Sequence, residues 1–372
     1  MSQVPAITLL DPGAACSAVR WDVPALTTAV AWQAVAATAA GDGTGSVKVF
    51  QGGRPASSRV LRPDPAQPGA TGRSGVERFL ALPGPTFCYA RDVQAWHRPL
   101  FEAMVEALTP HLMSGGLGSG PVETEVFAGD YQRTPGGVHR EACSNVHLVL
   151  AGAKTMHLWT GDDWMPPGVL RRGDVAAGAG TREEYLPTLN PAVALAAGRS
   201  LTGGPGQGFA WVAGTWHVAE THGPSAALNI AMYQHGLGAE PSLPVWGDRL
   251  DGAVPASFLD DYRRHVGAGA MPLAALLGRL SALGMRPAAV HRRPGPVRTV
   301  RRGLAVPILW VRPAPGELFV ATLGAVRRLP PRTPVDWLAE RWERAELTVP
   351  EEAAGLAGWL CLQGALEAKG ER

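Results

Sequence analysis

The chain has 372 residues, of which 46% are hydrophobic and 18% charged, and its formal net charge is +2. This composition excludes a disordered chain and a fibrous repeat, and the small net charge gives no reason to expect nucleic acid as a partner. Four cysteines without a CxxC pair exclude a disulfide scaffold and a zinc ribbon. No apolar run approaches the ~18 residues that span a bilayer, and no leader pattern opens the chain, so we expect a cytoplasmic protein without a membrane partner.

The first 235 residues contain the signals of an antiparallel β-fold. Residues 1–80 combine short apolar runs with a Gly-, Ser-, Pro- and Arg-rich stretch, where we expect a mobile loop near 52–75. From 92 to 112, apolar residues recur every three to four positions, which predicts an amphipathic helix. Short strands are then expected at 122–127, 146–152, 154–159, 208–214 and 227–233. Strands without intervening helices favour a sandwich or barrel.

The character of the sequence changes after residue 250. We expect helices at 256–285, from Thr333 as N-cap, and at 350–364, with strands at 304–311 and 317–323. The Arg-rich stretch 291–303 is expected to be a solvated basic loop. We therefore divide the chain into a domain at 1–250, with its core at about 85–235, and a C-terminal α+β, winged-helix-like domain at 251–372 for dimerisation or substrate binding.

His139 and Glu141 are candidate metal ligands. They are two residues apart, so on an extended segment both side chains point the same way. A third ligand from elsewhere completes a facial triad that leaves coordination positions open. His217, after the strand expected at 208–214, is the candidate for that ligand, and His222 is the alternative.

Lys154 is a second candidate functional residue, because only Lys48, Lys154 and Lys369 are lysines among 34 basic residues. We expect a hairpin that turns at Ala151–Gly152. Its register places one set of side chains on the face of the metal pair and leaves His157 and Trp159 on the other. That set comprises Asn145, His147, Val149, Lys154 and Met156. A buried ammonium needs an anion, which predicts a carboxylate held by Lys154 at one end and by the metal at the other.

This motif set resembles the cupin-type JmjC oxygenases, which depend on iron(II) and 2-oxoglutarate and include the asparaginyl hydroxylase of hypoxia factors and the ribosomal oxygenases. The asparaginyl hydroxylase pattern is HxD, an Asn four residues later, a Lys thirteen residues after the acid and a distal His. The matching residues, within about 85–235, are His139, Glu141, Asn145, Lys154 and His217.

The resemblance implies a mainly β protein with a double-stranded β-helix (cupin, jelly-roll) core. It implies Fe(II), with His139, Glu141 and His217 as ligands, and 2-oxoglutarate and O₂ as co-substrates. Lys154 is then expected to bind the distal carboxylate of 2-oxoglutarate, with Asn145 and Asn229 nearby.

Two positions depart from the family pattern. The acid is Glu141, as in the JmjC demethylases, rather than Asp. The family's Thr, three residues before the first His, is Gly136 here. The contact of that hydroxyl with the co-substrate carboxylate then has to come from Thr134, Tyr131 or His147.

The activity implied is hydroxylation of a C–H bond of an amino-acid side chain, with release of succinate and CO₂. The expected substrate lies within a peptide, such as a natural-product precursor, or within a protein. An oxygenase of a free amino acid or small metabolite and a catalytically inactive peptide-binding cupin are the alternatives. The tryptophans near the motif are expected to fill the core rather than form a substrate wall; they are Trp159, Trp164, Trp211 and Trp216.

Overall fold

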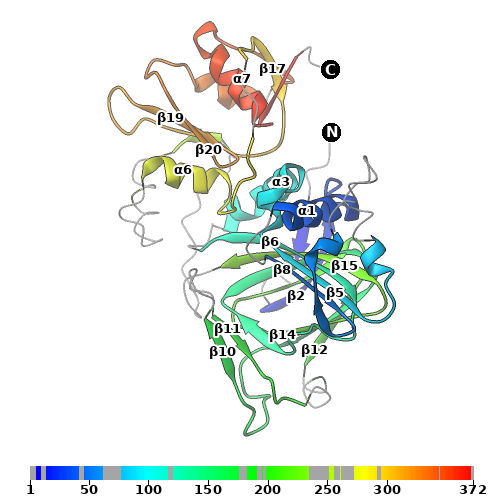
Figure 1. Ribbon diagram of the computed structural model, residues 1–372. Helices are drawn as coiled ribbons and strands as arrows, with labels where there is room; N and C mark the ends of the chain where they lie inside the picture. The colour runs from blue at the N-terminus through cyan, green and yellow to red at the C-terminus, as the bar shows by residue number, and fades with distance from the viewer. Residues whose placement is uncertain are drawn as a thin grey trace. The chain divides into compact units, whose positions relative to one another are not determined.

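The chain forms two compact units, residues 1–100 with 120–240 and residues 101–119 with 241–372, each described below by itself. The computed structural model (Figure 1) describes residues 6–9, 14–41, 46–61, 77–115, 120–175, 182–190, 195, 198–233, 251–254, 260, 272–290, 295–342 and 344–369. Within these ranges no helix is long and apolar enough to cross a membrane.

The first unit is built on two antiparallel sheets (Figure 1). In the described residues the larger sheet has nine strands, in the order β1-β2-β13-β8-β15-β6-β5-β3-β4. Its strands are β1 (Ala6–Leu9), β2 (Cys16–Asp22), β3 (Val47–Gln51), β4 (Arg54–Ala56), β5 (Thr86–Arg91), β6 (Val122–Asp130), β8 (Cys143–Ala151), β13 (Gln207–Trp211) and β15 (Ser225–Tyr233). The smaller sheet has six, in the order β10-β11-β7-β14-β9-β12. They are β7 (His139–Glu141), β9 (Lys154–Trp159), β10 (Arg172–Val175), β11 (Arg182–Tyr185), β12 (Arg199–Gly203) and β14 (Trp216–Thr221).

Successive strands alternate between the two sheets from β6 to β9 and again from β12 to β15. This alternation is that of a double-stranded β-helix, so the predicted jelly-roll core and mainly β class are confirmed. All five predicted strands of this region are present, at β6, β8, β9, β13 and β15.

The predicted hairpin at Ala151–Gly152 is wrong. Strand β8 pairs with β13 and β15, whereas β9 pairs with β12 and β14 in the other sheet. The chain turns a corner at Gly152, which has a φ of 68°, and a Cβ there would lie 2.3 Å from the carbonyl oxygen of Pro224. The predicted faces nevertheless hold, because the inner faces of both strands look into the space between the sheets.

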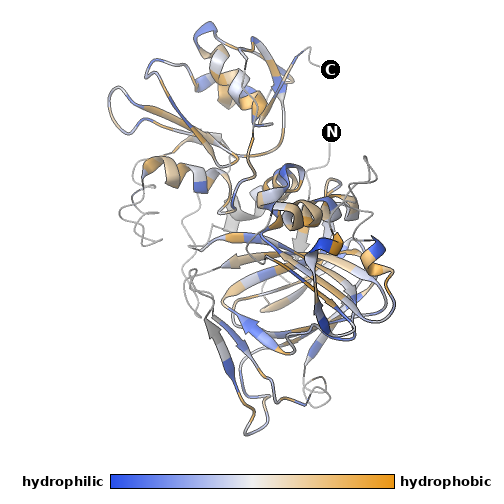
Figure 2. Cartoon of the chain, in the orientation of Figure 1, coloured by the Kyte–Doolittle hydropathy of each residue, from blue (hydrophilic) through white to orange (hydrophobic). Residues whose placement is uncertain are grey.

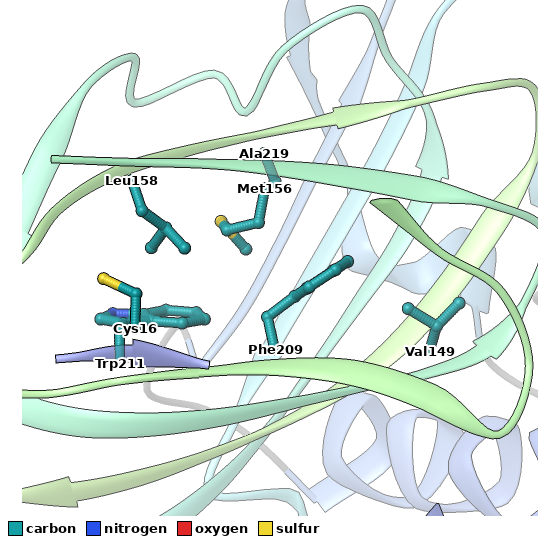
Figure 3. Packing of buried hydrophobic residues seen from close by; sticks show 7 residues of the cluster. All are labelled: Cys16, Val149, Met156, Leu158, Phe209, Trp211 and Ala219. Carbon is teal, nitrogen blue, oxygen red and sulfur yellow. The ribbon is translucent and has the colours of Figure 1, made fainter. Parts of the chain in front are cut away.

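An apolar cluster fills part of that space. Figure 3 shows Met156, Leu158 and Ala219 from the smaller sheet opposite side chains from the larger one. The opposing residues are Cys16, Val149, Phe209 and Trp211. Figure 2 shows hydrophobic and hydrophilic residues interleaved along these strands, as expected where one face of a strand is buried against a core.

The helical segments partly match the predictions. The helix expected at 92–112 is a 3₁₀ turn, η2 (Val93–Trp96), followed by α3 (Arg98–Gly115). The stretch expected as a loop contains β4 and a 3₁₀ turn, η1 (Ser58–Leu61), and its remainder, 62–75, lies outside the described residues. One further helix, α1 (Thr28–Gly41), belongs to the first unit.

The second unit is α+β. One sheet has the order β16-β18-β19-β20 and another the order β21-β17-β22. Their strands are β16 (Asp251–Ala253), β17 (Thr299–Arg302), β18 (Ile308–Val311), β19 (Leu318–Thr322), β20 (Ala325–Leu329), β21 (Glu346–Thr348) and β22 (Leu366–Ala368). The helices are α6 (Leu273–Ser281), α7 (Ala354–Leu362) and the 3₁₀ segments η3 (Asp336–Trp342) and η4 (Glu351–Ala353). The winged-helix likeness stays a prediction.

Residues 101–119 group with this unit rather than with the expected domain at 1–250. One reason is local: Glu106 on α3 accepts a hydrogen bond from the backbone N–H of Ala305, at 3.1 Å. The division at residue 250 itself stays a prediction.

Three local expectations for the second unit differ from the structure. The helix expected from Thr333 is instead η3, whose first turn is closed by an i to i−3 bond from Leu338 to Val335. Of the helix expected at 256–285 the described residues contain α6, preceded by Pro272 in an extended conformation with ψ of 143°. Residues 255–259, 261–271 and 291–294 lie outside the described ranges. The stretch expected as a basic loop at 291–303 instead contains β17 (Thr299–Arg302), and Arg298 and Arg301 form ion pairs with Glu351 and Glu367.

Candidate active site

The three predicted metal ligands meet between β7 and β14. His217 is the register partner of His139, and the two imidazole ring centroids are 4.2 Å apart. His139 Nε2 lies 4.0 Å from Glu141 Oε1. By contrast, His222 is exposed and hydrogen-bonds the hydroxyl of Thr155. The geometry therefore favours His217 over His222.

Both histidines present the nitrogen that a metal needs. His139 Nδ1 lies 2.9 Å from the carbonyl oxygen of Gly137, and His217 Nδ1 lies 3.0 Å from that of Thr215. A carbonyl only accepts, so each Nδ1 carries the proton and each Nε2 keeps its lone pair. Burial, and next the nearby His139, holds the pKa of His217 well below its usual value, so this ring is neutral.

The ligands need a small adjustment to share an ion. No group of three or more His, Cys, Asp or Glu side chains in the described part of the chain is ready-made as a metal site. Two donors, each ~2.1 Å from one ion, lie at most ~4.2 Å apart and closer when adjacent. The 4.0 Å between His139 Nε2 and Glu141 Oε1 exceeds the ~3.0 Å of two donors in adjacent positions, so the Glu141 side chain has to shift before both can bind one ion.

A buried hydrogen-bonded chain orients Glu141. Its Oε2 accepts from Cys143 Sγ at 3.3 Å and from Asn145 Nδ2 at 3.5 Å. Asn145 Oδ1 accepts from Asn229 Nδ2 at 2.7 Å, and the same amide donates to Glu125 Oε2 at 2.9 Å. The predicted Asn145 and Asn229 are thus both part of the site: Asn145 contacts Glu141 directly, and Asn229 contacts Asn145.

Glu125 belongs to this chain and was not predicted. It is 3% exposed, and its Oε1 accepts a 2.5 Å hydrogen bond from the Tyr89 hydroxyl. Burial, followed by the charge of Glu141, raises the pKa of Glu125 to about 8. The alternation of 122-VETEVF-127 was the available signal, because it places Glu123, Glu125 and Phe127 on one face of β6.

Lys154 is fully buried at the inner end of the site. Its Nζ lies 3.4 Å from His147 Nε2 and 5.5 Å from the ring centroids of both Phe127 and Tyr131. Within the described residues no carboxylate forms an ion pair with it. Burial lowers the pKa of Lys154 to about 7, and burial and Lys154 together lower that of His147 well below its usual value.

Polar atoms without partners surround the same space. In the described ranges, the buried side-chain atoms that lack a hydrogen-bond partner include the hydroxyl of Tyr131, Nε1 of Trp211 and Oδ1 of Asn229. Buried polar groups are normally satisfied. Three such atoms around a buried ammonium therefore indicate a site for a polar ligand.

One cavity joins the metal donors to Lys154. Its lining includes His139, Glu141, His217, Lys154 and Asn229, as well as Glu125, Phe127, Thr134, His147, Met156, Trp211 and Ala219. Of the three candidates to replace the missing hydroxyl at Gly136, the Thr134 hydroxyl already donates to the Ala219 carbonyl oxygen at 3.3 Å. The hydroxyl of Tyr131 has no hydrogen-bond partner in the part of the chain that the structure describes. The chemistry of these donors would suit a metal and a dicarboxylate. The cavity itself has a volume of about 30 Å³, so its lining side chains have to move apart before a dicarboxylate can extend to Lys154.

The tryptophans divide between two places. Trp159 and Trp216 are buried in an apolar cluster with Trp164 packed against it, which agrees with a core role. Trp211 lies inside the site, with its ring centroid 4.8 Å from that of His217.

A scan against protein-family models found no match, and neither did a search of curated proteins. Among solved structures, the chain is similar to E. coli ycfD, with 11% identity over 98% of this chain and 99% of that one, at a TM-score of 0.47. It is similar to the E. coli ribosomal oxygenase YcfD in complex with cobalt and 2-oxoglutarate, with 10% identity over 98% and 100% of the chains, at a TM-score of 0.45. A match to an oxalate decarboxylase covers 32% of this chain and 23% of the decarboxylase chain, with 10% identity and a TM-score of 0.20.

The likeness is distant, and the functional argument below rests on the residues of the site.

Proposed function

We propose that this protein is an iron(II)- and 2-oxoglutarate-dependent dioxygenase. It hydroxylates a C–H bond of an amino-acid side chain within a peptide or protein, and succinate and CO₂ are the co-products. The observation that carries the proposal is one cavity with two kinds of group at its ends. His139, Glu141 and His217 lie at one end, and the fully buried ammonium of Lys154 lies at the other.

A 2-oxoglutarate molecule satisfies both ends. Its distal carboxylate gives Lys154 the anion that a buried ammonium requires, and a charge-assisted bond of this kind is among the strongest in proteins. We infer that the Tyr131 hydroxyl supplies a second bond to that carboxylate, since it has no partner in the described residues and its ring centroid lies 5.5 Å from Lys154 Nζ. His147, whose pKa is lowered well below its usual value by burial and by Lys154, stays neutral beside the ammonium.

The protein residues orient the reactants and exclude water. When bound, Fe(II) would couple the oxidative decarboxylation of 2-oxoglutarate by O₂ to oxidation of the substrate, with one oxygen atom going to succinate and one to the new hydroxyl. Asn145 and Cys143 hold the Glu141 carboxylate by hydrogen bonds, while the carbonyls of Gly137 and Thr215 fix the two imidazoles. Trp211 and Met156 cover the cavity with apolar surface.

An anaerobic titration tests the proposal. Apo-protein is titrated with Fe(II) and then with 2-oxoglutarate, and the weak visible charge-transfer band of a chelated keto acid is recorded. We expect the band in the wild type, its loss in His217→Ala, and a far higher 2-oxoglutarate requirement in Lys154→Ala. Iron binding without the band refutes the co-substrate assignment. No iron binding favours the alternative of an inactive peptide-binding cupin.

We further propose that the second unit serves dimerisation or substrate binding and that the protein acts in the cytoplasm. Sedimentation of the full chain at several concentrations tests the dimer. A monomer throughout the micromolar range contradicts that part of the proposal.

A further inference from the structure

A second hollow opens beside the metal site. This outer groove has a volume of about 590 Å³ and shares Phe127, Thr134, His139 and Glu141 with the inner cavity. All the residues that line it belong to the first unit. Its size falls in the range of pockets that hold drug-sized ligands, roughly 300–1,000 Å³, and exceeds the need of one free amino acid.

Aromatic rings form two walls of the outer groove. Phe87, Tyr89 and Phe127 come from the nine-stranded sheet, and Tyr185 comes from β11 in the other. The Tyr185 ring is stacked on the metal-ligand candidate His139, with centroids 5.6 Å apart and an interplanar angle of 18°. The groove therefore offers flat apolar surface directly beside the metal donors.

Gly136 explains how Tyr185 reaches this position. A Cβ at residue 136 would lie 3.3 Å from Cε1 of Tyr185, tighter than ordinary van der Waals contact. A threonine side chain, as in the family pattern, would crowd the ring further. Glycine in place of the family's threonine at position 136 thus leaves room for the Tyr185 ring that forms one wall of this groove.

Lys48 is the groove cation without a counter-charge. It is exposed on β3, forms no ion pair within the described residues, and places Nζ 5.9 Å from the centroid of Tyr89. The other groove cation, Arg91, is paired with Glu123 at 2.5 Å. On the opposite wall, the Glu183 carboxylate accepts a hydrogen bond from Tyr185. The outer groove therefore has a positive wall and a negative wall.

We propose that the outer groove binds an acidic peptide segment. An Asp or Glu of the peptide pairs with Lys48, and a neighbouring apolar or aromatic residue lies on Tyr89, Phe127 and Tyr185, where its C–H bonds face His139 and Glu141. Glu183 repels the acid from the opposite wall and so sets the orientation. This inference rests on the proposed function and specifies its substrate class.

The test uses the full chain loaded anaerobically with Fe(II) and 2-oxoglutarate. The probes are acetylated and amidated peptides of sequence GEFEG, GQFQG and GKFKG, with N-acetylphenylalanine as a small free acid, and binding is followed by saturation-transfer NMR. In low salt we expect GEFEG to bind about fivefold more tightly than GQFQG, and the difference to fade at high salt. Lys48→Glu should reverse the order in favour of GKFKG, and Glu183→Gln should strengthen GEFEG about twofold.

Lys369→Glu is the matched control, because it makes the same charge change in the second unit and should leave the order unaltered. An unchanged order in Lys48→Glu overturns the proposal. So does equally tight, Lys48-dependent binding of N-acetylphenylalanine, which indicates a small-molecule acid. If the keto-acid band forms but no peptide binds selectively, the groove assignment alone fails; if the band itself is absent, the proposed function fails.

Discussion

Buried polar groups on the two faces of β9 and β14 differ in whether they have hydrogen-bond partners. On the outer face, His157 bonds Ser200 at 2.7 Å and Glu220 at 3.0 Å, and Glu220 also pairs with Arg133. On the inner face, Lys154 is buried without a carboxylate partner in the described residues. The nearby Tyr131 hydroxyl and Trp211 Nε1 have no hydrogen-bond partner among the described residues.

The difference separates groups that serve the fold from groups that await a ligand. A satisfied buried network such as that of His157 adds specificity to the folded state. An unsatisfied one costs free energy unless a bound molecule completes it. A bound ligand is therefore expected to contribute most on the inner face. The mutations proposed below are made there, and three of the four predictions include a matched change elsewhere.

The largest effect is expected for a metal ligand. His217→Ala removes one of three donors and should weaken Fe(II) or Mn(II) binding by at least about 100-fold, since even residues behind the ligands are typically worth 10–100-fold. His157→Ala, on the outer face with similar burial, should leave metal affinity within about threefold. Equal losses in the two variants, measured by calorimetry, would show that His217 acts through the fold alone.

Lys154→Met should move two quantities in opposite directions. Removing a buried ammonium without an anion should stabilise the ligand-free protein by about 1–4 kcal/mol in urea unfolding. The affinity for 2-oxoglutarate should fall at least about 30-fold, because the buried carboxylate loses its partner. The exposed Lys48→Met should change neither appreciably. A Lys154→Met protein that is less stable than the wild type and binds 2-oxoglutarate normally would show that Lys154 does not bind the distal carboxylate.

The pKa of Lys154 makes a pH-dependent prediction. Burial lowers it to about 7, whereas an unfolded lysine titrates near pH 10.4. Between these values the unfolded chain binds a proton that the folded ligand-free chain does not, so Lys154 adds stability as pH rises from about 7 to about 10. The stability difference between Lys154→Met and wild type should therefore shrink over this range in urea unfolding. A constant difference would mean that Lys154 keeps its proton.

The smallest effect is expected for Tyr131→Phe. The hydroxyl has no partner among the described residues of the ligand-free protein, so its removal should raise stability by about 1 kcal/mol, while 2-oxoglutarate affinity falls about tenfold. Tyr89→Phe provides the contrast, because it breaks the bond to buried Glu125 and should cost about 1 kcal/mol of stability. Unaltered 2-oxoglutarate affinity in Tyr131→Phe would leave His147 as the candidate for that contact.

The sequence predicted those parts of the site that follow from spacing along one strand or from the family motif. His139 and Glu141 are two residues apart on β7, and alternation alone places both on one face. Lys154 was marked by its rarity and by its register with the motif. Short strands without intervening helices predicted an antiparallel sandwich or barrel, and the family resemblance specified the jelly-roll.

The remainder depends on which strands become neighbours. Glu125 joins the site because β6 pairs with β15 in a register that sets it opposite Asn229. Tyr185 stacks on His139 because β11 pairs with β7. No local pattern specifies these partners. The false hairpin has the same origin, since Ala151–Gly152 suits a tight turn and a corner between sheets equally well.

A crystal structure of the protein with Co(II) and 2-oxoglutarate is the most direct test of the central claim. The account predicts an anomalous peak shared by His139, Glu141 and His217, and a carboxylate within hydrogen-bond distance of Lys154 Nζ. A metal on other residues, or 2-oxoglutarate bound away from Lys154, would contradict it.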